Sequence, residues 1–191
     1  MSSAVCVIFD CNIYIDVAEA LGFDASLANL RNFRTASRPL QAEIDAFQCV
    51  LAGKFGPYDL KLGSSLHIKD TVQHELSRLP EWSESSAKSF LDQFHDNLVD
   101  IMLTGFIGEE HVPPLDHEDG VVFGTCHEIR NTPGIVQTIL VTRDKQFADS
   151  FKDVPSHTTV LHPIGFMKLC DAAQRMPVSY THLTLPPNSR V

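Results

Sequence analysis

Four carboxylates stand at positions where a folded chain rarely places a charge. Asp10 and Asp144 each follow a run of apolar residues that is typical of a buried strand. Glu75 and Asp119 lie at helical spacing from apolar neighbours, on faces that we expect to point inward. Because an unpaired charge facing a core is costly, the four acids predict a shared cation. A set of oxygen ligands without histidine or cysteine favours Mg²⁺ or Mn²⁺ over zinc.

The spacing of the two helical acids supports this inward orientation. Glu75 follows Val72 by three residues and precedes Leu79 by four. Asp119 precedes Val122 by three residues, at the start of another apolar stripe. Residues three or four apart share one face of a helix. Both carboxylates are therefore predicted on faces that turn toward the core.

Each acid also has a purely structural explanation. Asp10 and Asp144 could cap the helices that follow them, as aspartate at a strand–helix junction often does. Glu75 could reach from the edge of its stripe into solvent. Asp119 could favour the positive end of a helix that Asp116 caps. A metal site becomes the better explanation because all four acids fall in the arrangement that one site requires.

The elements that must position these acids alternate between strand and helix. The pattern predicts strands at residues 4–9, 66–68, 136–141 and 158–161. It predicts helices at residues 12–21, 40–51, 70–79, 83–102, 117–130, 144–151 and 163–175. This order indicates an α/β fold with a central parallel sheet and helices on both faces. Ligands bind at the carboxyl ends of such strands, so Asp10 and Asp144 are expected together there.

Length and composition limit the architecture. At 191 residues, with 43% hydrophobic and 20% charged residues, the chain fits one compact domain. We expect this domain at residues 1–176, and a disordered or non-native tail at residues 177–191, which has two adjacent prolines and no helical period. Five cysteines without a CxxC spacing indicate reduced thiols rather than disulfides or a zinc cage. Neither a signal peptide nor a membrane span is expected, which favours the cytoplasm.

The formal net charge of −9 argues against a nucleic-acid binder, because phosphate contacts usually need a basic surface. A metal ion that neutralises the acids would remove part of this obstacle. The predicted RNA contacts are the three cations beside the predicted site: Lys69, Arg143 and Lys145. Arg31, Arg34 and Arg38 would share one face if residues 27–38 were helical, although a solvated face is the more ordinary explanation.

Four short motifs, taken in order, resemble those of the PIN-domain ribonuclease family. They are Ile8-Phe9-Asp10-Cys11-Asn12, His74-Glu75-Leu76, Asp116-His117-Glu118-Asp119 and Val141-Thr142-Arg143-Asp144-Lys145-Gln146-Phe147. The resemblance spans nearly all of residues 4–165. It implies a Rossmann-like three-layer sandwich and Mg²⁺- or Mn²⁺-dependent cleavage of single-stranded RNA. Many bacterial members are toxins of toxin–antitoxin pairs and form dimers, so the resemblance also implies an antitoxin partner and a homodimer.

The resemblance assigns the catalytic and metal-binding roles to an acidic quartet: Asp10, Glu75, Asp119 and Asp144. It makes Asn12 and Thr142 the supporting polar residues. The sequence departs from the family pattern at two places. The interval 80–115 is longer than in compact members, and Gly120 follows Asp119 where a helix former is commoner. The third acidic ligand therefore stays open among three neighbours: Asp116, Glu118 and Asp119.

Three other functions use similar residues. A structure-specific DNA nuclease would use the same acids. A catalytically silent PIN-like module would bind RNA or protein as a scaffold, which the negative net charge favours. A receiver-like signalling domain also clusters acids around Mg²⁺, but its required lysine and central phosphoacceptor aspartate are not convincingly placed in this sequence.

Overall fold

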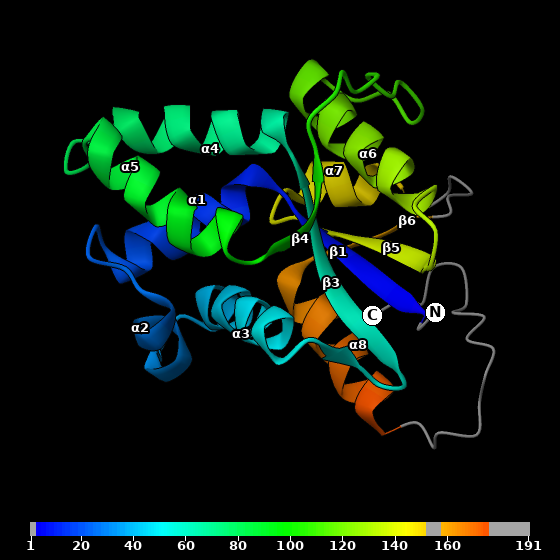
Figure 1. The fold of residues 1–191 in the computed structure, drawn as a ribbon, viewed down its shortest axis with the longest axis horizontal. Helices are drawn as coiled ribbons and strands as arrows, with labels where there is room; N and C mark the ends of the chain where they lie inside the picture. The colour runs from blue at the N-terminus through cyan, green and yellow to red at the C-terminus, as the bar shows by residue number, and fades with distance from the viewer. Residues whose placement is uncertain (1–2, 152–157, 176–191) are drawn as a thin grey trace.

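The computed structural model describes residues 3–151 and 158–175, which build an α/β fold (Figure 1). The strands of these ranges are β1 (Ala4–Phe9), β2 (Lys54–Phe55), β3 (Tyr58–Ser65), β4 (Val99–Leu103), β5 (Ile135–Val141) and β6 (Thr158–Leu161). They form one sheet in the order β2-β3-β1-β5-β6, and β4 pairs with β3 as well. Every pairing is parallel except the short antiparallel contact between β2 and β3. The predicted α/β class with a largely parallel sheet is confirmed.

Helices cover both faces of this sheet (Figure 1). They are α1 (Cys11–Leu21), α2 (Leu27–Asn32), α3 (Arg38–Ala52), α4 (Leu66–Arg78), α5 (Glu84–Leu91), the π-helix η1 (Asp92–Asp96), α6 (His117–Arg130), α7 (Lys145–Ser150) and α8 (Pro163–Gln174). α6 lies on one face, and α3 packs with α8 on the other. α4 contacts both α1 and α5 at the side where the strands end. This arrangement is compatible with a three-layer sandwich.

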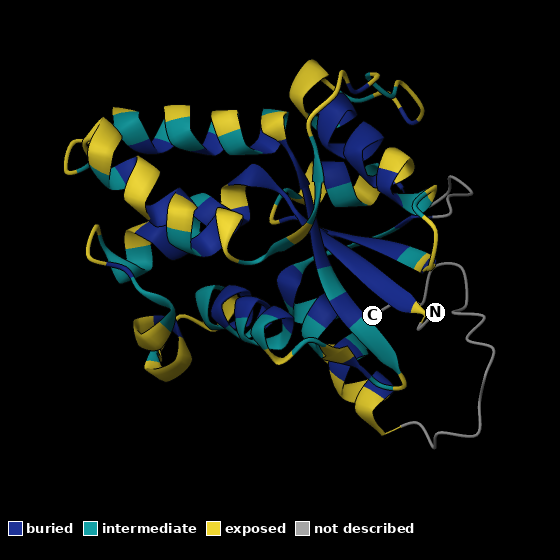
Figure 2. Cartoon of the chain, viewed as in Figure 1, coloured by how far each residue is buried: buried dark blue, intermediate teal, exposed yellow. Residues whose placement is uncertain are grey.

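β1 runs through the interior of the molecule (Figure 2). It pairs with β3 on one side and β5 on the other, and all six of its residues are buried. Coverage on both faces explains why its apolar run does not alternate with polar residues. The pairing with β5 continues to the last residues of both strands, Phe9 and Val141. Asp10 and Thr142 therefore leave neighbouring strand ends.

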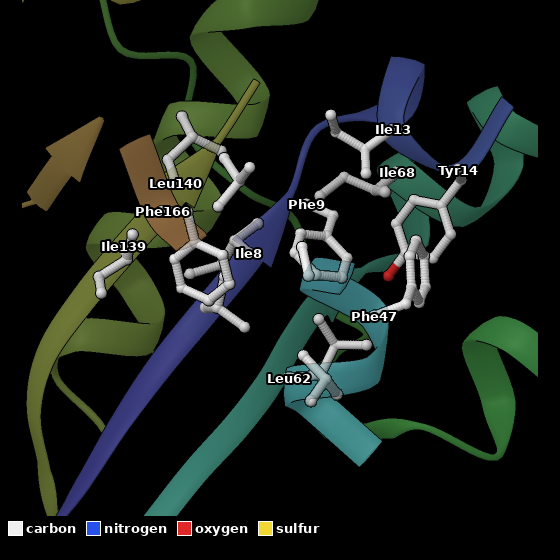
Figure 3. Close-up of a cluster of buried hydrophobic side chains, with 14 of the residues drawn as sticks. Ile8, Phe9, Ile13, Tyr14, Phe47, Leu62, Ile68, Ile139, Leu140 and Phe166 are labelled. Atoms are coloured by element: carbon white, nitrogen blue, oxygen red, sulfur yellow. The ribbon is translucent and has the colours of Figure 1, made fainter. Parts of the chain in front are cut away.

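An aromatic cluster fixes the end of β1 (Figure 3). Phe9 packs with Tyr14 of α1 and Phe47 of α3, and all three side chains are fully buried. The ring centroids of Phe9 and Phe47 lie 4.6 Å apart, and those of Tyr14 and Phe47 lie 5.3 Å apart. Rings in such tilted and edge-on contacts add to the stabilisation from buried area. The cluster ties both helices to β1 immediately before Asp10.

The strand predicted at residues 66–68 is wrong. These residues open α4, because the Ser65 hydroxyl accepts a hydrogen bond from the Ile68 N–H and caps the helix. The strand comes one segment earlier, as β3, in which the buried residues Leu60 and Leu62 alternate with more exposed neighbours. Alternation of this kind is the ordinary sign of a strand, and it was present in the sequence.

The helix predicted at residues 83–102 is right only at its beginning. α5 ends at Leu91, η1 continues to Asp96, and β4 follows. Phe90 and Phe94 stack at 4.5 Å and keep the helical stripe through the π-turn. Apolar residues after Asn97 continue the same spacing by coincidence, but they extend the sheet beside β3. A stripe of apolar residues therefore concealed a change from helix to strand.

The predicted tail at residues 177–191 lies outside the described residues. In the ranges that the structure describes, no helix has the length and apolar character needed to cross a bilayer.

Candidate functional site

Asp10 is a buried carboxylate at the end of the central strand. Its residue is 3% exposed, and its Oδ2 accepts hydrogen bonds from Thr142 Oγ1 at 2.7 Å and Asn12 Nδ2 at 3.4 Å. Asp10 occupies the N-cap position of α1, yet among the described residues its side chain makes no capping hydrogen bond to that helix. The capping explanation therefore does not account for Asp10.

Thr142 joins the two strand-end aspartates. This residue is fully buried, and its Oγ1 donates to Asp10 while accepting a hydrogen bond from the Asp144 N–H at 2.9 Å. The backbone closes the same junction, because Asp10 N–H donates to Val141 O and Thr142 N–H donates to Leu161 O, both at 3.0 Å. The structure thus brings the predicted supporting residues Asn12 and Thr142 to Asp10.

Asp144 caps the helix that follows it. Its Oδ1 accepts hydrogen bonds from the N–H groups of Gln146 at 2.6 Å and Phe147 at 3.1 Å. The helix-capping explanation therefore applies to Asp144, and the two hydrogen bonds fix the position of its carboxylate. The charge of Asp144 also acts on α6, because it contributes to the raised pKa of Asp119.

Asp119 faces the two strand-end acids from the first turn of α6. Burial raises the pKa of Asp119 from 3.8 to about 7, together with the charges of Asp116, Asp10, Asp144 and Glu118. Burial likewise raises the pKa of Asp10 from 3.8 to about 6, against the hydrogen bonds from Thr142 and its neighbours. The charges of Asp10 and Asp144 therefore act on Asp119, and we call these three residues the acidic edge.

The structure distinguishes the three candidates for the third acidic position. Asp116 is the N-cap of α6, since its Oδ1 accepts from the Asp119 N–H at 2.9 Å, and its residue is exposed. Glu118 is also exposed, although its charge contributes to the raised pKa values of Asp10 and Cys11. Only Asp119 combines partial burial with the influence of both strand-end acids. Asp119 is the best-placed of the three.

Glu75 differs from the prediction. Its side chain is 42% exposed and pairs with Arg78 at 3.2 Å. The charges that raise the pKa values of Asp10 and Asp119 do not include Glu75. The buried face of α4 is formed by Ile68, Val72 and Leu76, which are spaced four residues apart. Glu75 lies beside that face and reaches into solvent, as long side chains at a stripe's edge do.

The predicted RNA contacts are placed in different ways. Lys69 Nζ lies 2.7 Å from both carboxylate oxygens of Asp96. Arg143 pairs with Asp16, and its Nε lies 3.2 Å from Glu43 Oε1. Lys145 is exposed at the start of α7, beside Asp144. Lys145 is therefore the cation of the three most accessible to a ligand.

The second basic cluster does not lie on one helix. α2 ends at Asn32 and α3 begins at Arg38, so Arg31, Arg34 and Arg38 belong to separate segments. Their spacing of three and four residues therefore does not place them on one helical face. All three are exposed.

Glu43 is a buried acid that the sequence reading missed. It is fully buried on α3, and burial raises its pKa to about 7, helped by Asp16 and opposed by Arg143. The rule that selected Asp119 would also have selected Glu43, which precedes the buried Phe47 by four residues. Its partner could not have been inferred, because Arg143 is distant in the chain.

A second group of polar side chains, also missed, anchors the end of β3. His95 is buried, and its Nε2 lies 2.8 Å from Ser64 Oγ while its Nδ1 lies 3.0 Å from Asp96 Oδ1. Burial lowers the pKa of His95. Thr125 of α6 donates to Ser65 Oγ at 3.1 Å. These bonds hold η1 and α6 to the carboxyl end of β3.

The donor set of the acidic edge fits a hard divalent cation. The pKa values of Asp10 and Asp119 are raised, and a nearby cation would reverse this rise. In the described part of the chain, no group of three or more His, Cys, Asp or Glu side chains is already arranged around a metal position. The carboxylates would therefore have to close in when the ion binds.

Comparison with protein-family models and with curated proteins finds no match for the chain.

Proposed function

We propose that the protein is a Mg²⁺- or Mn²⁺-dependent endoribonuclease that cleaves single-stranded RNA at the acidic edge. The observation that carries this proposal is that Asp10 and Asp144, which follow neighbouring parallel strands, lie close enough to Asp119 of α6 for their charges to raise its pKa. Buried, repelling carboxylates are costly unless a cation neutralises them. The acids of this edge also fall within three of the motifs that resemble the PIN-domain family.

The acidic edge and the residue that supports it have different proposed roles. Asp10, Asp119 and Asp144 would hold the ion, which supplies charge neutralisation for the phosphate and an acidified water. Thr142 keeps the Asp10 carboxylate in place through its 2.7 Å hydrogen bond and orders the Asp144 backbone. Burial and neighbouring charges raise the pKa of Asp119 to about 7 without the ion. The bound ion would lower this pKa, so that the ionised carboxylate could orient the attacking water.

The finer parts of the proposal follow from the family resemblance. They are a Rossmann-like, PIN-type three-layer sandwich, a role as the toxin of a toxin–antitoxin pair, an antitoxin partner, a homodimer and a cytoplasmic location. The predicted fourth ligand, Glu75, would join the edge only by leaving Arg78. We therefore assign the reaction to the other three acids and propose that Glu75 lies outside the set of metal ligands.

A catalytically silent binding module is the second candidate. The exposed, paired position of Glu75 and the net charge of −9 both favour it. Such a module would leave the acidic edge without a bound ion. Its measurable sign would be the absence of Mn²⁺ binding in calorimetry.

The test is cleavage of an end-labelled single-stranded RNA with Mg²⁺, with Mn²⁺ and with EDTA. We expect metal-dependent cleavage by the wild type and a loss of about 100-fold or more in D10N and D119N. E128Q serves as the matched control, because Glu128 is an exposed acid on the same helix as Asp119. Full activity in D10N, or cleavage of duplex DNA alone, would overturn the proposal.

A further inference from the structure

Arg143 lies between the two residues that shape the end of β5, Thr142 and Asp144. Its backbone belongs to the segment that follows the strand, and its side chain reaches two other elements. Its Nη1 forms an ion pair with Asp16 of α1, and its Nε lies 3.2 Å from Oε1 of Glu43 on α3. One side chain therefore joins the end of β5 to both helices.

The ion pair with Asp16 connects the elements that carry two acids of the edge. Asp10 is the N-cap residue of α1, and Asp16 lies in the same helix. Arg143 directly precedes Asp144, which is the N-cap residue of α7. The pair therefore limits how far Asp10 and Asp144 can move apart. A fixed spacing of carboxylates matters at this site, because Mg²⁺ accepts little deviation from octahedral geometry.

Glu43 holds the guanidinium group from the interior. The residue is fully buried, and neither of its carboxylate oxygens accepts a hydrogen bond from the described residues. Its ion pair is with Arg143, and an ionised acid that is buried without a counter-ion is costly. An Arg143 side chain that turned outward to a ligand would leave Glu43 in that state. The position between the two carboxylates is therefore favoured, although 41% of the Arg143 side chain is exposed.

We infer that Arg143 is a positioning residue, whose two ion pairs fix the spacing of Asp10 and Asp144. The inference rests on the proposed function, because it assumes that the acidic edge binds a divalent ion. It replaces the role of RNA contact that the sequence predicted for Arg143. Lys145, which is exposed beside Asp144, keeps that role.

The sign of the effect on metal binding separates positioning from a simple effect of charge. Removing a cation beside a metal site should strengthen metal binding, because a repulsion is removed. R143Q should instead bind Mn²⁺ about 10-fold more weakly, since the loss of a side chain that orients the ligands has this effect. K145Q is the matched control, because Lys145 is an exposed cation directly after Asp144. It should bind Mn²⁺ at least as tightly as the wild type.

The experiment is calorimetric titration of the full-length protein and its variants with Mn²⁺. Wild-type affinity in R143Q, or an affinity raised as in K145Q, would overturn the inference while leaving the proposed function intact. No binding of Mn²⁺ by the wild type would refute the proposed function, and the inference with it.

A double variant deals with the buried acid that R143Q leaves without its counter-ion. That acid can lower the stability of R143Q for a reason unrelated to the metal. E43Q/R143Q removes both charges, and circular dichroism establishes that each variant is folded. The double variant should bind Mn²⁺ as weakly as R143Q. Wild-type affinity in E43Q/R143Q would contradict the positioning role.

RNA binding in EDTA gives a readout that needs neither cleavage nor metal. In the D10N background, R143Q should leave the salt slope of single-stranded RNA binding unchanged, whereas K145Q should reduce it by about 1. A slope reduced by R143Q to the same extent would reveal a phosphate contact and overturn the inference.

Discussion

Asp10 shows how one side chain can work against the stability of its own fold. The aspartate is buried at the end of β1, and burial raises its pKa to about 6. The difference from 3.8 corresponds to about 3 kcal/mol when the carboxyl group is ionised. Thr142 and Asn12 compensate for only part of this cost with their hydrogen bonds. A chain that keeps such a residue has a use for its charge.

The first prediction concerns stability against pH in EDTA. Folding raises the pKa values of Asp10 and Asp119, so the folded chain holds these protons more tightly than the unfolded chain. Their contribution to stability is complete below about pH 4 and is lost as the pH rises through about 6 to 7. The midpoint of urea unfolding should therefore fall over this interval, and Mg²⁺ should restore it at pH 8.

The D10N variant isolates the contribution of Asp10 from those of Glu43 and His95. At pH 8 in EDTA, D10N should be more stable than the wild type by about 1–3 kcal/mol. The advantage should shrink toward pH 4 and vanish below about pH 3, where the wild-type carboxyl group is protonated in both states. A constant difference across the pH range would show that Asp10 is not ionised with a raised pKa.

The second prediction concerns Thr142, which contacts both strand-end acids. T142V keeps the volume but removes the hydroxyl that donates to Asp10 and accepts from the Asp144 N–H. We expect a loss of about 1–2 kcal/mol in unfolding free energy. Metal-dependent RNA cleavage should fall about 10-fold or more, because ligand orientation is lost. T142S retains the hydroxyl and should recover most of both quantities; equal damage in T142S would point to packing instead.

At the scale of elements, the loop between β4 and α6 lies directly on the α6 backbone. A Cβ on Gly124 would stand 2.2 Å from Gly108 O, and one on Gly120 would stand 2.7 Å from Glu110 O. Glu110 N–H also donates to Gly120 O at 3.1 Å. Gly120 and Gly124 therefore allow the backbone of the loop to approach α6 closely. This approach sets the path of the chain into the turn that carries Asp119.

The third prediction follows from this contact. G124A should destabilise the fold by about 1–3 kcal/mol, because the backbone of the loop must move to admit the methyl group. G165A is the matched control, since a Cβ there has no neighbour closer than 3.7 Å. That variant should be neutral or slightly stabilising, because alanine is the better helix former. Chemical denaturation of both variants measures the contrast, and equal effects would contradict the close-contact explanation.

The elements that could be predicted are those whose sequence pattern fits only one kind of secondary structure. β1 is buried along its whole length, so its unbroken apolar run predicted it closely. β5 was predicted within one residue, and α6 was found with its observed bounds. β4 pairs with β3 directly after η1, and its apolar residues also continue the helical spacing of the segment before it. Propensity cannot decide between these alternatives without knowledge of the neighbouring strands.

The candidate site was predictable to the same degree. Strand ends brought Asp10 and Asp144 together as expected, and face spacing identified Asp119. Glu75 failed because Leu79, which was used to place it on the buried face, is the C-cap residue of α4 and lies outside the helix. The face is formed by Ile68, Val72 and Leu76, and Glu75 lies at its edge. The partners of Arg143 depend on tertiary packing alone.

At the scale of the whole molecule, the net charge of −9 opposes any polyanion. Part of this charge belongs to the acidic edge, and a bound divalent ion would reduce it there. Approach of RNA then depends on the few cations that remain available near the edge. Lys145 is exposed next to Asp144, whereas Lys69 and Arg143 have carboxylate partners.

The fourth prediction tests this distribution of charge. In a D10N background that prevents cleavage, K145A should weaken binding of a single-stranded RNA and reduce the salt slope by about 1. K54A is the control, because Lys54 of β2 pairs with Asp59 of β3. It should leave both the affinity and the slope unchanged. Fluorescence anisotropy at several salt concentrations provides the measurement, and identical slopes for K145A and its parent would exclude a phosphate contact.

The central place of β1 has a consequence for how the protein is made. β1 is synthesised before every other strand, but it pairs with β3 and β5, which emerge from the ribosome later. Asp10 therefore lacks Thr142 and Asp144 as neighbours until the segment that follows β5 has been translated. A nascent chain shorter than β5 holds no assembled edge of acids. Whatever this edge does to other molecules begins only after β5 and Asp144 have left the ribosome.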